Sequence, residues 1–144
     1  MYKRKKVVNS KKITIDGIQF QSRLEGEMYK RLKKAGIPHQ YEKKSYIILD
    51  GFVYPSEVWE RAQKRSKFMS DRRSVTSTKY TPDFADPKER WFIEVKGRAN
   101  ERFPLVFKLF KKLMSEREPP PMIFKPMSTK DCDEVIKILK ENGY

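Results

Sequence analysis

The chain is poor in the residues that build disulfide frameworks, histidine-based sites and membrane spans. Its 144 residues include one cysteine, Cys132, and one histidine, His39. A single cysteine excludes an internal disulfide and a cysteine-rich zinc site, which fits a reducing cytoplasm. A single histidine excludes a cluster of histidine metal ligands and a histidine general base, and we interpret His39 as structural. No apolar run reaches the roughly 18 residues that a membrane-spanning helix needs.

Acidic residues are scarce beside the basic ones. The sequence has 33 lysines and arginines against 19 aspartates and glutamates, a net charge of +14. A charge this large on a small chain favours a polyanionic partner, and nucleic acid is the first candidate. A ribosomal-type or merely soluble basic protein would have the same balance. The length predicts a single domain over residues 1–144, with 1–12 as a basic arm on DNA or a solvated tail. Because no apolar segment follows its basic residues, the N-terminus does not resemble a secretory signal.

Turn and capping signals divide the chain into strands and helices. Asp16-Gly17 suits a tight hairpin turn, Ser22 a helix N-cap, Gly36 a helix end and Pro104 a helix start. The expected elements are a hairpin over 13–20, a helix over 22–35, a strand within 40–49 with 51–54 continuing the sheet, strands at 78–84 and 91–96, a helix over 104–116, a strand at 122–125 and a helix from 128. This order predicts an α/β fold, a mixed sheet flanked by helices.

Apolar residues at helical spacing predict the packing face of each helix. These faces are Leu24, Met28, Leu32 and Ala35 in the first helix, Leu105, Val106, Leu109, Phe110, Leu113 and Met114 in the second, and Val135, Ile136 and Leu139 in the third.

Residues 56–77 form a basic insertion with the least regular pattern. Residues 57–68 can be helical, but the segment is dense in cationic side chains. These are Arg61, Lys64, Arg65, Lys67, Arg72 and Arg73. Two interpretations stay open, a solvated face and a surface that holds the DNA backbone. Arg98 and Arg102 are further candidates for contact with a phosphate, against ordinary surface charge.

The stretch YTPDFADPKERWFIEVKGR carries the clearest chemical pattern. Asp83 follows a proline, and ten residues separate it from Glu94. That spacing accommodates two adjacent strands and a turn, so the two carboxylates are expected at one end of a strand pair. Glu94 and Lys96 project to the same side of a strand, and Val95 projects to the other. Two carboxylates that share a divalent cation, with an ammonium beside them, suit the hydrolysis of phosphodiesters.

Glu25 allows two interpretations. It stands three residues after Ser22, so it can complete a capping box. It also lies closer to the apolar stripe of its helix than Glu27 does, and a carboxylate near a buried face needs a partner. We therefore expect Glu25 to be a third acid of the site, with Glu27 as the alternative.

These residues resemble a known superfamily. Pro82-Asp83 with Glu94-Val95-Lys96 is similar to the signature of the PD-(D/E)xK, or restriction-endonuclease-like, nucleases. The stretch FQSRLE at 20–25, Tyr41-Glu42 and YTPDF at 80–84 resemble the endonuclease I-type Holliday junction resolvases of phages. DGIxFxS at 16–22 resembles small phage proteins of the same superfamily. The likeness covers roughly residues 13–115.

The resemblance implies a restriction-endonuclease-like core and a Mg²⁺- or Mn²⁺-dependent DNA endonuclease. Asp83, Glu94 and the Val95 carbonyl would bind the metal, Glu25 would complete the site, and Lys96 would be the catalytic lysine. Branched DNA, such as a Holliday junction, is the expected substrate, and resolution by two cuts implies a homodimer. A phage protein of this kind would act in the cytoplasm of a bacterial host.

Two other functions remain open. One is a nuclease that nicks or cuts ordinary duplex within a phage replication, packaging or transposition machine. The other is a non-catalytic basic DNA-binding protein, which would bind DNA with a steep dependence on salt and without turnover.

Overall fold

The structure is a computed structural model that describes residues 11–61, 63–70, 73–97 and 102–144. The chain forms two compact units, each assembled from separate segments. Unit 1 consists of Met1–Lys43, Pro82–Ala99 and Pro121–Tyr144, and unit 2 consists of Lys44–Thr81 and Asn100–Pro120. The described residues form one mixed sheet and three two-stranded antiparallel sheets, flanked by three helices. The expected α/β class is therefore confirmed.

A hairpin and a capped helix begin unit 1. Strands β1 (Ile13–Ile15) and β2 (Ile18–Phe20) pair antiparallel around Asp16 and Gly17, which both have positive φ, as the Asp-Gly pattern predicts. Helix α1 (Arg23–Lys34) starts after the predicted N-cap Ser22 and is followed by Gly36, whose φ is +68°. The hairpin packs on the start of the helix, where a Cβ on Gly26 would lie 2.9 Å from Cγ2 of Ile13.

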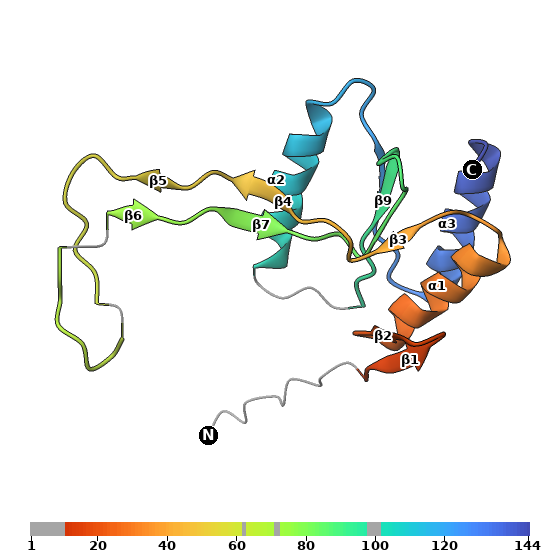
Figure 1. Ribbon diagram of the computed structural model, residues 1–144, viewed down its shortest axis with the longest axis horizontal. Helices are drawn as coiled ribbons and strands as arrows, with labels where there is room; N and C mark the ends of the chain where they lie inside the picture. Colours follow the sequence, from red (N-terminus) through yellow and green to blue (C-terminus); the bar gives the residue numbers. More distant parts are fainter. Residues whose placement is uncertain (1–10, 62, 71–72, 98–101) are drawn as a thin grey trace. The chain divides into compact units, whose positions relative to one another are not determined.

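A four-stranded mixed sheet forms the centre of unit 1 (Figure 1). Its strand order is β10 (Met122–Phe124), β9 (Trp91–Ile93), β8 (Phe84–Ala85) and β3 (Gln40–Tyr41). β10 and β9 are parallel, whereas β9, β8 and β3 are antiparallel neighbours. Helix α3 (Thr129–Glu141) follows the predicted N-cap Ser128 and lies beside α1.

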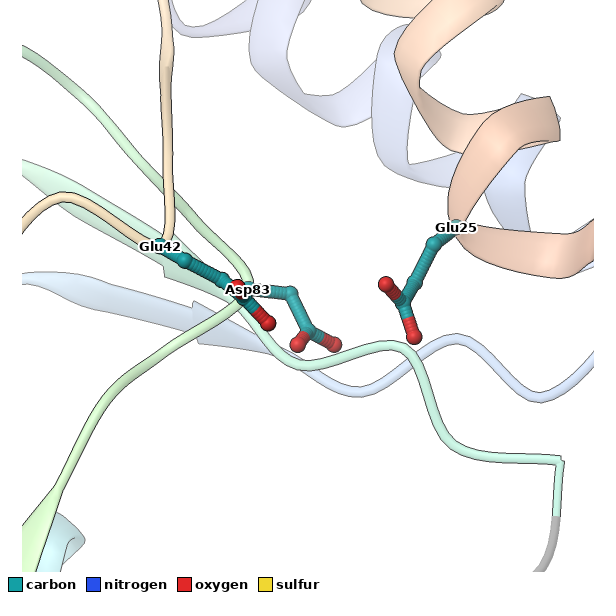
Figure 2. A group of neighbouring side chains, drawn as sticks. All are labelled: Glu25, Glu42 and Asp83. Carbon is teal, nitrogen blue, oxygen red and sulfur yellow. The ribbon is translucent and has the colours of Figure 1, made fainter. Parts of the chain in front are cut away.

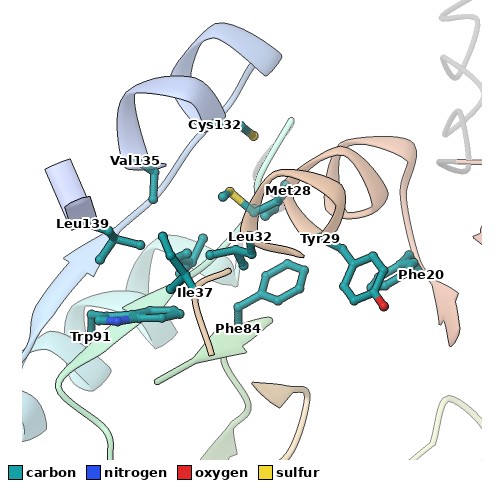
Figure 3. Packing of buried hydrophobic residues seen from close by; sticks show 12 residues of the cluster. Phe20, Met28, Tyr29, Leu32, Ile37, Phe84, Trp91, Cys132, Val135 and Leu139 are labelled. Carbon is teal, nitrogen blue, oxygen red and sulfur yellow. The ribbon is translucent and has the colours of Figure 1, made fainter. Parts of the chain in front are cut away.

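The core of unit 1 lies between this sheet and the two helices (Figure 3). Helix α1 contributes Met28 and Leu32, the sheet contributes Phe84 and Trp91, and α3 contributes Leu139, all with an exposed fraction of zero. Cys132 and Val135 are buried in the same cluster, and Leu24, Ala35 and Ile136 pack against it. The packing faces predicted for the first and third helices are therefore confirmed.

Unit 2 combines a long two-stranded ribbon with one helix. Strand β4 (Tyr46–Leu49) pairs antiparallel with β7 (Thr78–Tyr80), and β5 (Phe52–Val53) pairs with β6 (Ser74–Val75) further along the ribbon (Figure 1). Helix α2 (Phe103–Ser115) packs on β4 and β7. Its phenylalanine Phe110 lies against the rings of Tyr46 and Tyr80, with centroids 5.7 and 4.6 Å apart.

Three expectations need correction. Among the described residues of 57–68 there is no helix, because Glu60 and Met69 form a bridge that makes this stretch the end of the ribbon. The expected strand over 78–84 is interrupted at 81–83, between β7 and β8. The packing face of α2 consists of Phe103, Phe107, Phe110 and Met114, and the predicted face residue Leu105 is 60% exposed.

The remaining expectations on organisation concern the whole chain. Residues 1–10 of the basic N-terminal arm lie outside the described residues, and the single-domain interpretation stays a prediction. In the described part of the chain, no helix combines the length and the hydropathy needed to cross a membrane.

Candidate functional site

Strand pairing in unit 1 brings three acids into one row. β8 pairs antiparallel with β9 on one side and with β3 on the other. The residue before β8 is Asp83, so it lies opposite Glu94, which follows β9, and opposite Glu42, which follows β3. The N–H of Glu42 donates to the carbonyl of Asp83 at 2.8 Å. The expected position of Asp83 and Glu94 at one end of a strand pair is the observed one.

Glu25 reaches the same place from helix α1. One carboxylate oxygen each of Glu25, Glu42 and Asp83 lies within 4.8 Å of the other two, and the three side chains point toward one another (Figure 2). Glu25 and Asp83 are 6% and 9% exposed, and Glu42 is exposed. Carboxylate oxygens are the ligands that hard divalent cations such as Mg²⁺ prefer.

Several hydrogen bonds fix the orientation of Glu25. Its N–H donates to Oγ of Ser22 at 3.1 Å, and its Oε1 accepts the Ser22 hydroxyl at the same distance. Its Oε2 accepts the N–H of Gln21 at 3.1 Å and the hydroxyl of Tyr41 at 2.8 Å. The Glu25 carboxylate therefore takes part in a variant of the capping box, in which it accepts the N–H of Gln21 instead of that of Ser22, and it also lies beside Asp83.

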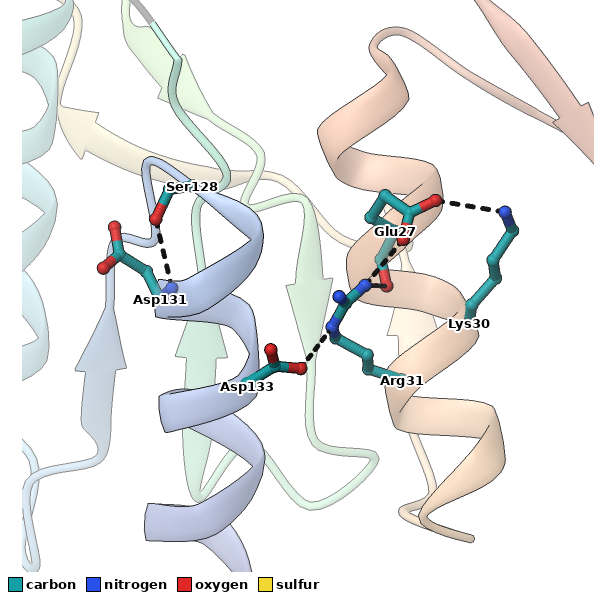
Figure 4. A network of polar contacts seen from close by, with 6 residues as sticks. All are labelled: Glu27, Lys30, Arg31, Ser128, Asp131 and Asp133. Atoms are coloured by element: carbon teal, nitrogen blue, oxygen red, sulfur yellow. Dashed lines mark hydrogen bonds and ion pairs between the residues drawn. The ribbon is translucent and has the colours of Figure 1, made fainter.

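Glu27 belongs to a different surface. Its carboxylate accepts Nζ of Lys30 at 3.1 Å and a guanidinium nitrogen of Arg31 at 2.7 Å, and Arg31 also donates to Asp133 of α3 at 2.6 Å (Figure 4). This network joins α1 to α3. Glu25, and not the alternative Glu27, is therefore the glutamate of α1 that lies beside Asp83.

The extended backbone continues past the end of β9. The N–H groups of Glu94 and Lys96 donate to the carbonyls of Phe124 and Pro126, at 2.9 and 3.0 Å. Val95 between them is buried in the apolar core, and its N–H donates to Oδ2 of Asp83 at 2.7 Å. The extended backbone and the burial of Val95 agree with the predicted alternation of side chains over residues 94–96. The hydrogen bond from Val95 also ties Asp83 to the segment that carries Glu94.

Electrostatic repulsion is concentrated at Asp83. Burial, followed by the negative charges of Glu94 and Glu25, raises the pKa of Asp83 well above its ordinary value. Burial and the charge of Glu25 also raise the pKa of Glu42. The hydrogen bond from the Val95 N–H lowers the pKa of Asp83, but this effect is smaller than the combined effect of burial and the neighbouring charges. The raised pKa of Asp83 thus follows from its burial and from the carboxylates around it.

This donor set fits a hard divalent cation. Oxygen ligands suit Mg²⁺ and Mn²⁺, and a cation would relieve the repulsion that the buried carboxylates of Asp83, Glu94 and Glu25 create. The Asp83 carboxylate accepts the Val95 N–H through Oδ2. The part of the Val95 carbonyl and the catalytic part of Lys96 stay predictions.

Glu42 is the site residue for which the sequence assigned no role. In the sequence it stands out only as half of the Tyr41-Glu42 pair, which belongs to the resemblance. Its proximity to Asp83 depends on the pairing of β3 with β8, which joins segments more than 40 residues apart. Its φ of 42° is unusual for a residue other than glycine and holds the side chain just beyond the strand end.

Most of the predicted DNA-binding cations lie on unit 2. Arg102 at the start of α2 is exposed, and Arg72 and Arg98 lie outside the described residues. The others are exposed along the ribbon: Arg61, Lys64, Arg65, Lys67 and Arg73.

A family model described as "Protein of unknown function (DUF1064)" matches residues 4–118, and the chain belongs to this family. Neither the search of curated proteins nor the search of solved structures gave a match.

Proposed function

We propose that this protein is a metal-dependent DNA endonuclease of the PD-(D/E)xK type. The observation that carries the proposal is the row formed by Asp83, Glu94 and Glu42 with Glu25 beside it, in which the pKa of Asp83 is raised. Carboxylates that repel one another at the end of a sheet are costly to keep, and binding a cation offsets this cost. The net charge of +14 supports a polyanionic substrate.

In this proposal, each residue of the site has a separate role in hydrolysis. Asp83 and Glu94 would hold Mg²⁺ or Mn²⁺, with Glu25 and Glu42 completing the site. A bound divalent cation supplies Lewis acidity and a hydroxide near neutral pH. Lys96 would orient the attacking water or neutralise charge on the phosphate. The hydrogen bonds from Gln21, Ser22 and Tyr41 would hold the Glu25 carboxylate in place before substrate arrives.

The substrate that we propose is branched DNA, such as a Holliday junction, in a phage-infected bacterial cytoplasm. Resolution of a junction needs two coordinated cuts, which a homodimer provides. This part of the proposal comes from the resemblance in residues 13–115. A nuclease that cuts ordinary duplex is the competing form of the same chemistry.

A cleavage assay tests both the proposed reaction, metal-dependent cleavage of DNA, and the proposed substrate, branched DNA. The wild type is incubated with Mg²⁺ or Mn²⁺ and with four-way junction, nicked, single-stranded or linear duplex DNA. Glu25→Gln and Glu94→Gln are expected to lower the cleavage rate by at least about 100-fold. Glu27→Gln is the matched control, since Glu27 lies on the same helix in the network with Arg31, and it should cleave like the wild type.

The pattern of products separates the alternatives. Paired symmetric cuts in the junction support a resolvase. Equal cutting of linear duplex supports the general nuclease. If DNA is bound but no metal-dependent cleavage occurs on any substrate, the enzymatic proposal is wrong and a basic DNA-binding protein remains.

A further inference from the structure

The ribbon of unit 2 exposes an unusual amount of apolar surface. Among the described residues, ten large hydrophobic side chains are exposed, and eight of them lie within residues 47–69. Four of them are aromatic: Phe52 is 49% exposed, Tyr54 45%, Trp59 50% and Phe68 57%. A two-stranded ribbon is only marginally stable alone, and exposed apolar surface of this kind indicates a partner.

The two most distal rings form a pair. The centroids of Trp59 and Phe68 lie 5.7 Å apart with an interplanar angle of 32°. The backbone bridge between Glu60 and Met69, with hydrogen bonds of 2.9 and 3.0 Å, holds the two strands together beside them. The rings are therefore placed side by side on a closed turn and are half exposed.

The turn between these rings is strongly cationic. Arg61, Lys64, Arg65 and Lys67 are all exposed, and the structure gives none of them an ion pair with a described carboxylate. Two described acids lie close to Trp59 in the sequence: Glu60, and Glu57, whose carboxylate accepts the indole N–H of Trp59 at 3.3 Å. Aromatic rings and exposed cations thus share one tip, which we call the ribbon tip (residues 59–61 and 63–69).

The positive charge of the ribbon tip favours a nucleic acid over a second copy of this chain as its partner. A second copy of this chain would bring an equally cationic tip against the first, at a net charge of +14 for each copy. A nucleic acid satisfies both features, because its bases stack on aromatic rings while its phosphates meet lysine and arginine. In a duplex the base faces are covered by their neighbours, so only unpaired bases can stack on a protein ring.

We infer that the ribbon tip binds unpaired nucleotides, with a base stacked on the Trp59–Phe68 pair and the flanking phosphates against the four cations. This inference deepens the proposed nuclease function and rests on it for its biological setting. It assigns to unit 2 the recognition of unpaired bases, as at a junction centre or fork, whereas the acid row of unit 1 performs the hydrolysis.

Binding without turnover tests this inference separately from catalysis. The full chain is titrated in EDTA with a labelled dT oligonucleotide of about 16 nucleotides. An abasic oligomer of equal length is the matched probe, because it has the same phosphates and no bases. Trp59→Ala is expected to weaken dT binding about tenfold and to leave abasic binding nearly unchanged. Trp59→Phe retains a ring and should restore most of the affinity.

A control variant and a fluorescence measurement show whether any loss of affinity is specific to the rings of the ribbon tip. Met127→Ala removes another exposed hydrophobic side chain, 51% exposed and outside the ribbon, and should change neither affinity. Tryptophan fluorescence of the wild type should be quenched by dT and not by the abasic oligomer. Trp91 supplies only a background, since it is fully buried.

Two outcomes would overturn the inference. One is equal affinity of the wild type for dT and abasic oligomers. The other is a Trp59→Ala variant that keeps its preference for dT but sediments as a monomer where the wild type is a dimer, which would assign the rings to a second copy. A protein that discriminates between the two oligomers but cleaves nothing would retain the inference and refute the nuclease proposal.

Discussion

Replacing Asp83 with asparagine is expected to stabilise the metal-free protein and to abolish its stabilisation by divalent cations. Asparagine has nearly the same shape, and its side-chain oxygen can still accept the Val95 N–H that donates to Oδ2 at 2.7 Å. The change therefore removes the charge while the main hydrogen bond remains. A purely structural aspartate would respond in the opposite direction.

The size of the expected stabilisation by Asp83→Asn can be worked out from the distance between the neighbouring carboxylates. With oxygens of Glu25 and Asp83 within 4.8 Å, two ionised groups repel by about 3 kcal/mol at an effective dielectric constant of about 20. Glu42 adds little because it is exposed and screened by solvent. Solvent screening relieves part of this repulsion, so we expect a net gain of about 1–2 kcal/mol for Asp83→Asn where Asp83 of the wild type is ionised.

The gain should depend on pH. Because burial and the charges of Glu94 and Glu25 raise the folded-state pKa of Asp83, its contribution to stability is fully present below the ordinary value of 3.8. It is lost as the pH rises through the folded-state pKa, since the unfolded chain has by then released the proton. Wild type and Asp83→Asn should thus have similar stability in acid and diverge toward alkaline pH.

Thermal unfolding with and without metal measures these effects. In EDTA at alkaline pH, where the two proteins should differ most, the melting temperature of Asp83→Asn should exceed that of the wild type by roughly 2–6 °C. Millimolar Mg²⁺ or Mn²⁺ should raise only the wild type. A destabilised Asp83→Asn at this pH, or equal metal responses of the two proteins, would refute the reasoning.

Asp86 is the matched control. It is 2% exposed and accepts three hydrogen bonds from Arg90, two of them from the guanidinium at 2.6 and 2.9 Å. These bonds lower the pKa of Asp86. Its contribution is therefore present above 3.8 and lost as the pH falls through the folded-state pKa, so Asp86→Asn should destabilise by about 1 kcal/mol at neutral pH and converge with wild type in acid.

Three other substitutions or treatments have defined outcomes. Lys96→Met should abolish cleavage and leave DNA binding in EDTA nearly unchanged, as gel shifts beside a cleavage assay can show; equal loss of both would make Lys96 a binding residue. Gly26→Ala should destabilise by about 1–2 kcal/mol in chemical denaturation, because the new Cβ would lie 2.9 Å from Ile13 Cγ2 and 3.0 Å from Ile15 Cδ1. Burial raises the pKa of the Cys132 thiol to about 11, so native protein should resist thiol reagents at neutral pH and react only on unfolding, and rapid native labelling would contradict this burial.

Local chemistry in the sequence predicts the elements around the site. Asp16-Gly17 determines a tight turn, and Ser22 and Gly36 delimit α1, because each signal acts within a few residues. The ten residues between Asp83 and Glu94 suffice for a turn between two adjacent strands, so their opposition could be predicted as well. These features depend only on short-range geometry.

Contacts between distant segments could not be predicted in the same way. Glu42 joins the acids only because β3 pairs with β8, and no local pattern encodes that pairing. The expected helix at 57–68 fails because contacts across the turn, such as Trp59 with Phe68, outweigh helix propensity. Leu105 was assigned to the face of α2 from its apolar character, but the phenylalanines one turn apart, such as Phe107, occupy that face.

The interleaving of the two units has a consequence for biosynthesis. The hydrogen bond between Arg31 and Asp133 joins residues 102 positions apart, and α3 supplies Leu139 to the core on which α1 rests. During translation the first helix therefore waits for residues 121–144 before its apolar face is covered. Since α1 also carries Glu25, we expect the acid row to reach its final packing only after α3 has been synthesised.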